Sequence, residues 1–514
     1  MTITLLTGEK TEHISAEPGM TLLDALRREE GQKIHAPCGG QGTCKKCRVY
    51  LVTPQGEEEV LACRTEAREG MTLRLPAEAP LVVETGDNSP AVLPDQDLTG
   101  YGIACDIGTT TVACHLVELS TGRVLATLGE GNAQRAYGAD VISRIKASMD
   151  GLRPALTSAI RQQLARMIKT LCDSRHLKTS DITAMTVAAN TTMCHLLTGL
   201  SPDSIGTAPF TPLSLFGTEF EASELELPFE GSVYIIPAVS GYVGGDITAD
   251  LLAAGLDQTE KATLLIDVGT NGEMALGRGD RFLCCSTAAG PAFEGAQISC
   301  GMTAAPGAIS KVEWVEDAIS CSVIGGGEAT GLCGSGLIDA MALMLQLGAV
   351  DETGRMLDIE EDEGEIPDSA LPYLFLLDDE PAFRLCDKVF VTQGDVRKLQ
   401  LGKGAIAAGV QVLMDTYGTN YNRIGALLLA GGFGSYIRPE SAARIGLIPG
   451  ELLPVTKAVG NTAALGALYA LVSGEAKRRL HDLQGNMEYL ELSGMVAFNN
   501  AYMEAMMFPE EEDA

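Results

Sequence analysis

Four cysteines near the N-terminus have the residue type and spacing of metal ligands. Cys38, Cys44 and Cys47 stand in the run CGGQGTCKKC, and Cys63 follows after fifteen intervening residues. Four thiolates can hold a [2Fe–2S] cluster, and the glycines of the first loop let backbone N–H groups turn towards its sulfides. Structural zinc is the alternative, but zinc ligands usually come as two short knuckles, and only Cys44 and Cys47 form one. The spacing therefore favours an iron–sulfur cluster.

A second chemical pattern occurs twice, 161 residues apart, as an apolar strand followed by D-x-G-T. Each copy places a carboxylate at a strand end, followed by backbone N–H groups and hydroxyls in a tight hairpin. Such a hairpin suits a phosphate, with the aspartate binding Mg²⁺ directly or through water. Two copies in register indicate an internal duplication. The residues predicted to bind nucleotide here are Asp106, Gly108, Thr109, Thr110, Asp267, Gly269, Thr270, Asn271 and Gly272.

A third glycine turn follows the apolar strand 426–430 and contains Gly431, Gly432 and Gly434. Glycines at this position would let the backbone lie against an adenine or ribose face. The alternative is a tight strand-to-helix turn with a structural role only. No Walker A or G-x-G-x-x-G sequence offers a competing nucleotide site.

Three polar residues are candidates for catalysis, each with a structural alternative. Asp246 follows two glycines and would serve as a ligand of Mg²⁺-bound water or as a general base; otherwise it is a helix N-cap. Glu273 would orient an attacking water, or else face solvent from a strand. Asn190 would position a phosphate or water, or else cap a helix. His115 and His195 have no suitably spaced partner and are expected to be core or surface residues rather than ligands.

The elements that position the cysteines are short. We expect strands at 2–6, 13–16, 48–52 and 60–63, a helix at 21–30 and a turn at 53–59. This order resembles the β-grasp fold of plant-type [2Fe–2S] ferredoxins. Two details depart from the plant pattern: the first cysteine loop has one extra residue, and the fourth cysteine arrives after a single hairpin.

The chain of 514 residues is long enough for two or three domains. We predict an α+β β-grasp ferredoxin domain at 1–82 and a Pro- and acid-rich linker at 83–100. An α/β duplicated RNase H-like domain follows at 101–514, with halves at about 101–258 and 262–514. A linker of this length spans about 20–25 Å on average, so the cluster is either mobile on a tether or packed down.

Composition excludes several classes of protein. The net charge of −31 argues against nucleic acid, because nothing would offset the repulsion of the phosphates. No apolar run is long enough to span a bilayer and no signal peptide is evident, so we expect no membrane and a reducing cytoplasm. Lys45, Lys46 and Arg48 lie at the cluster; they either compensate its charge or form a docking face for an acidic partner.

The three turns together resemble the phosphate-1, phosphate-2 and adenosine motifs of the ASKHA superfamily, which includes sugar kinases, Hsp70 and actin. With six further segments, the order of motifs resembles the reductive activases of corrinoid proteins over nearly the whole chain. These segments are 187–197, 237–250, 289–296, 331–339, 395–406 and 498–509. Some members of that family carry an additional small domain after the linker, whereas the first ASKHA strand starts here at Tyr101.

The resemblance implies an ATP-dependent electron transferase that uses a [2Fe–2S] cluster, ATP and Mg²⁺. An external low-potential reductant would load one electron, and the acceptor would be the Co(II) corrinoid of a methyltransferase-associated corrinoid protein, returned to Co(I). A homodimer is left open. Alternatives are an ATP-gated donor to another low-potential metalloenzyme, a redox-sensing nucleotide-binding module without turnover, and a small-molecule kinase.

Overall fold

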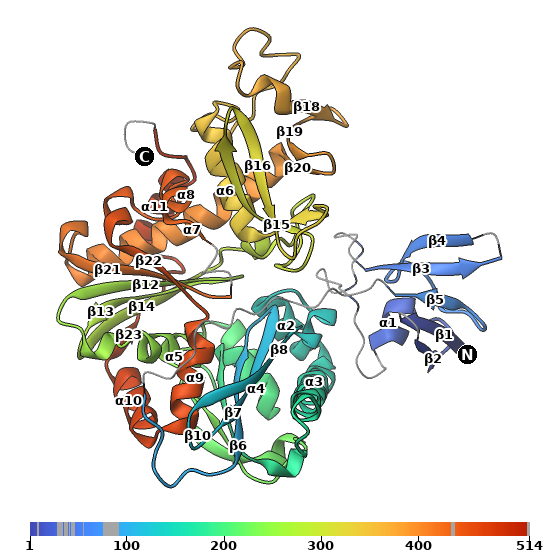
Figure 1. The fold of residues 1–514 in the computed structure, drawn as a ribbon, viewed down its shortest axis with the longest axis vertical. Helices are drawn as coiled ribbons and strands as arrows, with labels where there is room; N and C mark the ends of the chain where they lie inside the picture. Colours follow the sequence, from blue (N-terminus) through green and yellow to red (C-terminus); the bar gives the residue numbers. More distant parts are fainter. Residues whose placement is uncertain are drawn as a thin grey trace.

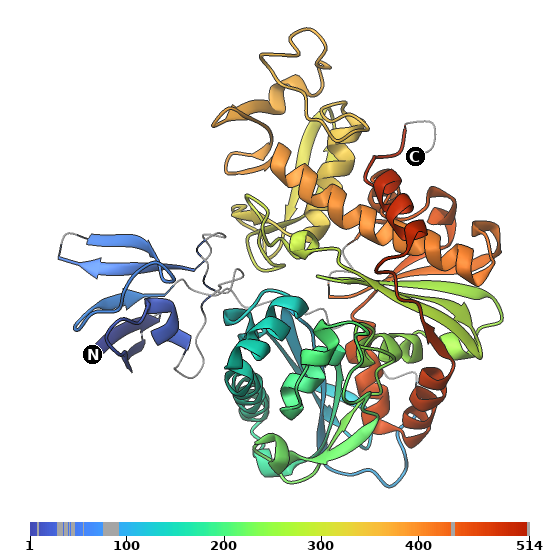
Figure 2. The same cartoon turned by 180° about the vertical axis from the view of Figure 1, so that it is seen from behind.

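The computed structural model describes residues 1–7, 10–27, 34, 40, 42, 47–54, 56–75, 92–432 and 437–510 (Figures 1 and 2). The first 75 residues form a five-stranded sheet in the order β2-β1-β5-β3-β4, in which β1 and β5 run parallel. Leu22, Leu23 and Leu26 of α1 are buried against this sheet. The elements are β1 (Thr2–Thr7), β2 (Lys10–Ser15), α1 (Leu22–Arg27), β3 (Arg48–Thr53), β4 (Gly56–Leu61) and β5 (Thr72–Arg74).

This arrangement is the mixed sheet with a packed helix that the β-grasp prediction requires. Three features differ from the prediction: the central strand β5 was not predicted, β2 begins at Lys10 rather than at residue 13, and β4 begins at Gly56, inside the expected turn, and ends at Leu61 before Cys63. The run of glutamates in β4 looks unlike a strand, yet Arg48 and Arg74 pair with Glu59 and Glu57 at 3.3 and 2.6 Å on its exposed face. These cross-strand ion pairs let a charged segment complete the sheet edge.

The first half of the larger domain is a six-stranded sheet in the order β10-β11-β9-β6-β7-β8. In this sheet β6 pairs antiparallel with β7 and parallel with β9. Helices α3 and α4 cover one face. The elements are β6 (Tyr101–Ile107), β7 (Thr111–Glu118), β8 (Arg123–Gly131), α2 (Val141–Ala147), α3 (Arg153–Ser174), β9 (Ile182–Ala189), α4 (Thr191–Thr198), β10 (Thr218–Glu221), β11 (Ser232–Ile235) and α5 (Gly245–Ala253).

The second half repeats this sheet in the order β22-β21-β12-β13-β14-β23, with β12 antiparallel to β13 and parallel to β21. The first strands of the two halves, β6 and β12, even share the same residue-by-residue burial, with the aspartate at the sixth position half-buried between buried neighbours. The elements of this sheet are β12 (Ala262–Val268), β13 (Gly272–Arg278), β14 (Arg281–Thr287), β21 (Ile424–Ala430), β22 (Thr456–Gly460) and β23 (Met487–Tyr489). The topology of the described residues supports the predicted duplication.

The two sheets are stacked with α5 and α9 between them, and one apolar cluster joins residues of both sheets and both helices (Figure 1). A smaller unit of strands and α6 is inserted before α7 and extends away from the sheets (Figures 1 and 2). The remaining elements are β15 (Ala308–Val315), β16 (Ala318–Val323), β17 (Gly331–Leu332), α6 (Gly334–Gln346), β18 (Leu374–Leu377), β19 (Glu380–Cys386), β20 (Val389–Thr392), α7 (Gln393–Tyr417), α8 (Pro439–Arg444), α9 (Thr462–Val472), α10 (Gly474–Gly485) and α11 (Val496–Ala505).

The end of the predicted linker is attached to the second half. The Asp95 backbone N–H donates to Val472 O at 2.9 Å, and the Asp95 carboxylate accepts from Gly474 N at 2.8 Å. Leu98 packs against the cluster between the sheets. Residues 92–100 are therefore anchored to the larger domain through Asp95 and Leu98, while 83–91 lie outside the described residues.

Among the described residues, Arg27 joins the N-terminal domain to the larger one. The Arg27 Nε–H donates to Ala136 O at 2.6 Å, and Tyr137 OH donates to Arg27 O at 3.2 Å. The guanidinium also lies 5.5 Å from the centre of the Tyr137 ring. A Cβ on Gly40, in the cysteine loop, would lie 3.8 Å from the same guanidinium. Arg27 thus connects the cysteine loop to the segment that follows β8.

Candidate functional site

A cavity of about 130 Å³ lies where the two aspartate hairpins meet. It is lined by nearly all of the residues that the sequence predicted to bind nucleotide or to act in catalysis. These are Asp106, Gly108, Thr109, Thr110, Asn190, Asp246, Asp267, Gly269, Thr270, Asn271, Glu273, Gly431 and Gly432. Gly272 lies just behind the lining, where a Cβ would come within 2.5 Å of Ile406. Gly434 lies outside the described residues.

Several carboxyl groups share this cavity, and burial raises their pKa values. The pKa of Asp106 and of Asp267 is raised to about 7, mainly by burial and then by neighbouring carboxylates. Burial raises the pKa of Asp246 to about 6 against the opposing effect of backbone N–H groups. The described lining contains no Lys, Arg or His. A phosphate would therefore need a divalent cation to enter this cavity.

Asp250, which the sequence did not single out, lies behind this group. It is one turn after Asp246 on α5, fully buried, and accepts a hydrogen bond from Thr462 Oγ1 at 2.6 Å. Burial and the charge of Asp267 hold its pKa well above the ordinary range. Its periodicity on an apolar helix could have identified it, because an aspartate on a buried helix face needs a partner.

The first hairpin is supported from behind by Arg144 of α2, which is fully buried. Its guanidinium donates to Thr109 O, to Gly138 O at 3.0 Å and to Met193 Sδ at 3.0 Å. Burial lowers its pKa to about 9, so it remains charged at neutral pH. Sequence reasoning missed Arg144 because its partners come from segments far apart in the chain.

The two hairpins are joined by Glu294, a third residue that sequence reasoning missed. Its carboxylate accepts from the Thr110 hydroxyl and, at 3.0 Å, from the Thr270 backbone N–H. The hydroxyls of Thr110 and Thr270 lie 3.4 Å apart. Glu294 ends the short 3₁₀ turn Pro291–Glu294 and is 7% exposed.

The catalytic candidates all line the cavity, and two structural alternatives prove wrong. The N-cap of α5 is Gly244, so Asp246 is not the cap but lies in the first helical turn. Glu273 is 8% exposed rather than facing solvent, and its Oε1 accepts from Asn190 Nδ2 at 3.4 Å. Asn190 lines the cavity, and its Oδ1 caps α4 by accepting from Thr192 N at 2.9 Å, so the structural alternative is confirmed and its contact with phosphate or water stays a prediction.

The third glycine turn follows β21, which ends at Ala430, while residues 433–436 lie outside the described residues. Gly431 has φ +104°, and a Cβ there would lie 2.5 Å from Asp267 Oδ1. Only glycine fits this position. Asp106 is held from the other side by Asn461, whose Nδ2 donates to Asp106 Oδ2 at 2.8 Å.

Both histidines that were set aside as ligands are core residues, as predicted. His195 is fully buried, and its ring nitrogens are engaged by Thr191 O at 2.8 Å and by the backbone N–H of Leu213 at 3.2 Å. His115 is buried beside Thr127, and burial lowers its pKa to about 4.

Two of the four predicted cluster ligands, Cys47 and Cys63, lie in described residues. Both are buried, and their Sγ atoms are 3.2 Å apart. Gly40 and Gly42 have φ values of +100° and +77°, and a Cβ on Gly42 would meet the Arg64 guanidinium at 2.0 Å. The adjacent thiols, and a loop with two positions that favour glycine, fit a cysteine-held cluster. Cys38 and Cys44 lie outside the described residues.

Neither a protein-built metal cluster nor a membrane-spanning helix occurs among the described residues. No group of three or more His, Cys, Asp or Glu side chains there is arranged around a common metal position. None of the described helices combines the length and apolar character that a bilayer crossing needs.

Three family models match successive parts of the chain. Residues 6–68 match the 2Fe-2S iron-sulfur cluster binding domain, 101–259 the RACo middle region, and 261–514 the C-terminal domain of RACo, described as the ASKHA domain. The boundary between the second and third coincides with the boundary between the two sheets. The region that the family calls its middle is therefore the first half of the duplicated domain.

Named relatives match between about three quarters and nearly all of the chain. The corrinoid activation enzyme RamQ of Eubacterium limosum is 31% identical over 93% of this chain and 94% of its own length. The [Co(II) methylated amine-specific corrinoid protein] reductase of Methanosarcina barkeri is 25% identical over 78% of this chain and 76% of its own. The solved structure of a reductive activator for corrinoid,iron-sulfur protein superposes with a TM-score of 0.74 at 28% identity, covering 99% and 98% of the two chains.

The order of the parts, the fold and the full-length similarity agree with one another. The chain carries an iron–sulfur domain, followed by a duplicated domain whose cavity is built from the ASKHA hairpins. On this evidence the chain belongs to the RACo family, as an enzyme of the reductase and activator type.

Proposed function

We propose that this protein is an ATP-dependent reductive activator that passes one electron through a [2Fe–2S] cluster to the Co(II) corrinoid of a methyltransferase-associated corrinoid protein, restoring Co(I). The observation that carries the proposal is the joining of two sites in one chain. Buried Cys47 and Cys63 lie side by side in a β-grasp domain, and a carboxylate-lined cavity lies between two ASKHA hairpins. The named relatives act on corrinoid proteins, which supplies the acceptor.

The residues of the cavity fit a magnesium nucleotide. Asp106 and Asp267 would hold the ion directly or through water, and the hydroxyls and N–H groups of Thr109, Thr110 and Thr270 would hold phosphate oxygens. Asp246, Glu273 and Asn190 lie where they can orient a water molecule for attack on the terminal phosphate. Gly431 lets the backbone pass close to Asp267, where a Cβ would lie 2.5 Å from Oδ1, and with Gly432 it would contact the nucleoside.

The cluster, held by Cys38, Cys44, Cys47 and Cys63, would supply one-electron chemistry from an external low-potential reductant. Transfer to a Co(II) corrinoid is energetically uphill, so the protein must stabilise the state in which the electron has moved. Nucleotide and partner can do this only by binding that state more tightly than the other. Their binding free energy then appears as a shift in the redox equilibrium.

The proposal also covers the cellular compartment, the partners and the oligomeric state of the enzyme. The described cysteines are all unbridged thiols, which suits a reducing compartment, and we place the enzyme in the cytoplasm on that basis. The partners are the corrinoid protein and the reductant, without nucleic acid or membrane. A homodimer is compatible with this function but is not required by it.

The test is the reduction of a purified Co(II) corrinoid protein, followed by its visible spectrum, with a chemical reductant, the chain, and ATP or no ATP. Cobalt reduction should require both the chain and ATP. Cys63→Ser should abolish cluster absorbance and reduction while leaving nucleotide binding unchanged. An intact cluster and full activity in Cys63→Ser would contradict the ligand assignment.

The same assay decides between the remaining functions. Hydrolysis of ATP without reduction of cobalt would point to another low-potential metalloenzyme as acceptor. Nucleotide binding without any hydrolysis would indicate a redox-sensing module, whereas partner-stimulated hydrolysis that disappears in Asp267→Ala would exclude one. Phosphate recovered in an organic product would indicate a kinase.

A further inference from the structure

Glu294 has hydrogen bonds that a bound phosphate would otherwise make. Thr110 Oγ1 donates to Glu294 Oε2, and the Thr270 backbone N–H donates to Glu294 Oε1 at 3.0 Å. These donors come from the two hairpins to which the proposed function assigns the phosphates. A hydroxyl and a backbone N–H each carry one hydrogen. The carboxylate and a phosphate oxygen therefore compete for the same donors.

The competition also involves charge. Glu294 lines the cavity together with Asp106 and Asp267, and all of its close polar contacts with the hairpins are to donors. Burial raises the pKa of Glu294, and the hydrogen bonds from Thr110 and Thr270 oppose this effect in favour of the charged form, as does the positive field of Arg135. A carboxylate held in this way resembles one edge of a phosphate group in charge and acceptor geometry.

We propose that the Glu294 carboxylate is an internal competitor of the nucleotide phosphates, which joins the two hairpins of the cleft and must release them when a di- or triphosphate binds. Thr110 belongs to the first half of the domain, and Thr270 and Glu294 belong to the second. The exchange of Glu294 for phosphate therefore replaces a direct bond between the halves by one made through the ligand. Glu294 is on this view a positioning residue that sets nucleotide affinity.

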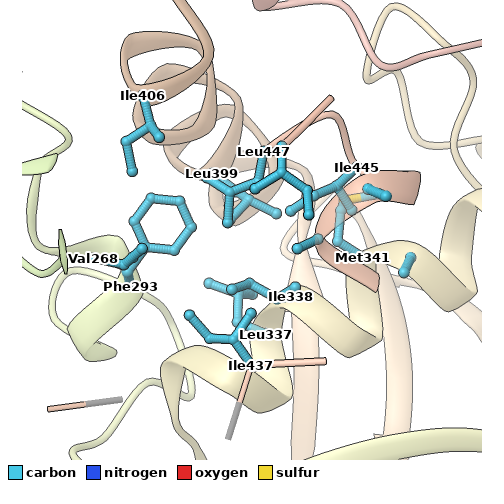
Figure 3. Close-up of a cluster of buried hydrophobic side chains, with 14 of the residues drawn as sticks. Val268, Phe293, Leu337, Ile338, Met341, Leu399, Ile406, Ile437, Ile445 and Leu447 are labelled. Carbon is cyan, nitrogen blue, oxygen red and sulfur yellow. The ribbon is translucent and has the colours of Figure 1, made fainter. Parts of the chain in front are cut away.

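The backbone that carries Glu294 is fixed, so the side chain alone must move. The preceding residue, Phe293, is buried among Leu337, Ile338 and Ile406 from α6 and α7 (Figure 3). A Cβ on Gly334 would lie 1.6 Å from Phe293 O, which shows how closely α6 approaches this turn. Gly295, which follows, has φ +71° and leaves no room for a side chain beside Met302 O.

The inference rests on the proposed nucleotide function and deepens it, and a series of three ligands separates the two. Adenosine, MgADP and MgATP are titrated against the full-length chain and its Glu294→Gln variant by calorimetry. Glutamine keeps the size of the side chain but removes its charge and weakens its acceptors. The variant should bind MgATP about tenfold more tightly, MgADP less so, and adenosine with unchanged affinity.

Glu273→Gln is the matched control, because it removes another buried carboxylate from the same cavity without touching either hairpin donor. Its MgATP affinity should change much less than that of Glu294→Gln. Glu294→Asp, which keeps the charge but retracts it by one methylene, should give an intermediate gain and guards against a folding defect in the first variant.

Each outcome decides one question. If the wild-type chain binds adenosine but not MgATP and Glu294→Gln binds both, the competitor is stronger than proposed but real. Equal or weaker MgATP binding by Glu294→Gln overturns the inference while leaving the nucleotide function intact. Equal gains in Glu294→Gln and Glu273→Gln overturn it too, because general charge repulsion would then explain the effect. A wild-type chain and variants that bind none of the three ligands overturn both.

Discussion

At the scale of single residues, the protonation of the cleft carboxyls makes stability depend on pH. The pKa values of Asp106 and Asp267 are raised to about 7, whereas in the unfolded chain these groups ionise near their ordinary value of 3.8. Between these pH values the folded state binds more protons than the unfolded state. The free energy of unfolding should therefore be highest below about pH 4 as far as these groups contribute, and fall as pH rises to about 7.

Urea unfolding at pH 5, 6, 7 and 8 measures this contribution to the free energy of unfolding. It should amount to a few kcal/mol, because each carboxyl contributes about 1.4 kcal/mol for every unit by which its pKa is raised. Asp106→Asn should reduce the loss of stability across the range. Millimolar Mg²⁺ at pH 8 should restore part of it, because the cation binds the ionised carboxylates. A free energy of unfolding that rises with pH in wild type and falls in Asp106→Asn would contradict the pKa directions.

The sequence alone predicted the residues that follow a local pattern. The two D-x-G-T hairpins and the candidates Asn190, Asp246 and Glu273 were found because each stands at a strand end or beside glycines. Glu294, Asp250 and Arg144 were not, since their roles depend on partners that are distant in sequence. Glu294 lies 184 residues from the threonine that donates to it.

At the scale of elements, the turn that carries Glu294 depends on a single aromatic anchor. Phe293 is 1% exposed within the apolar cluster of the second half. Phe293→Ala should lower the free energy of unfolding by about 3–5 kcal/mol, because it leaves a cavity between α6 and α7. Denaturant unfolding measures the loss, and Phe293→Leu, which fills most of the space, should cost clearly less.

The same variant connects packing with ligand binding. A loosened turn Pro291–Glu294 should hold the Glu294 carboxylate less well against the two hairpins. The affinity of Phe293→Ala for MgATP should therefore fall by a much smaller factor than its folding equilibrium constant. If MgATP affinity falls by as large a factor as the folding equilibrium, the turn is needed to form the cavity itself rather than to restrain it.

Elements with a clear apolar period were predictable, and those defined by charge were not. The strands before both hairpins were evident from unbroken apolar residues. By contrast the first four residues of β4, which include three glutamates in a row, were assigned to a turn, because the pairing partners Arg48 and Arg74 lie on other strands. Cross-strand compensation of this kind has no local signal in the sequence.

At the scale of the whole molecule, Arg27 is the described contact between the two domains. Arg27→Ala removes the bond to Ala136 O and the contact with the Tyr137 ring. A hydrogen bond from a charged donor is worth about 1.5–3 kcal/mol, so the docking equilibrium should weaken by about 10- to 100-fold. Small-angle X-ray scattering should then show a larger radius of gyration.

Arg74→Ala is the control for this measurement, because Arg74 pairs with Glu57 within the ferredoxin sheet and makes no described contact with the larger domain. Its radius of gyration should match that of wild type. An unchanged radius in Arg27→Ala would show that the domains are held together in solution by something other than this contact.

The domain order was predictable from the sequence, but the relation between the domains was not. The boundary near residue 100 followed from a run of prolines and acids. The attachment of Asp95 to Val472 and Gly474, across more than 370 residues of chain, has no sequence signal, and neither has the contact of Arg27 with Ala136.

The attachment of Asp95 also has a kinetic meaning. It fixes the start of the larger domain, so the ferredoxin domain is held within reach by the chain between Leu75 and Val92, which can extend to at most about 60 Å. Confinement to such a volume gives one domain an effective concentration near the other of about a millimolar. At that concentration a contact worth about 4 kcal/mol is half-populated, so the bond of Arg27 supplies a large part of the free energy that the docked arrangement requires. It is also weak enough that a partner binding in the micromolar range can take the ferredoxin domain away.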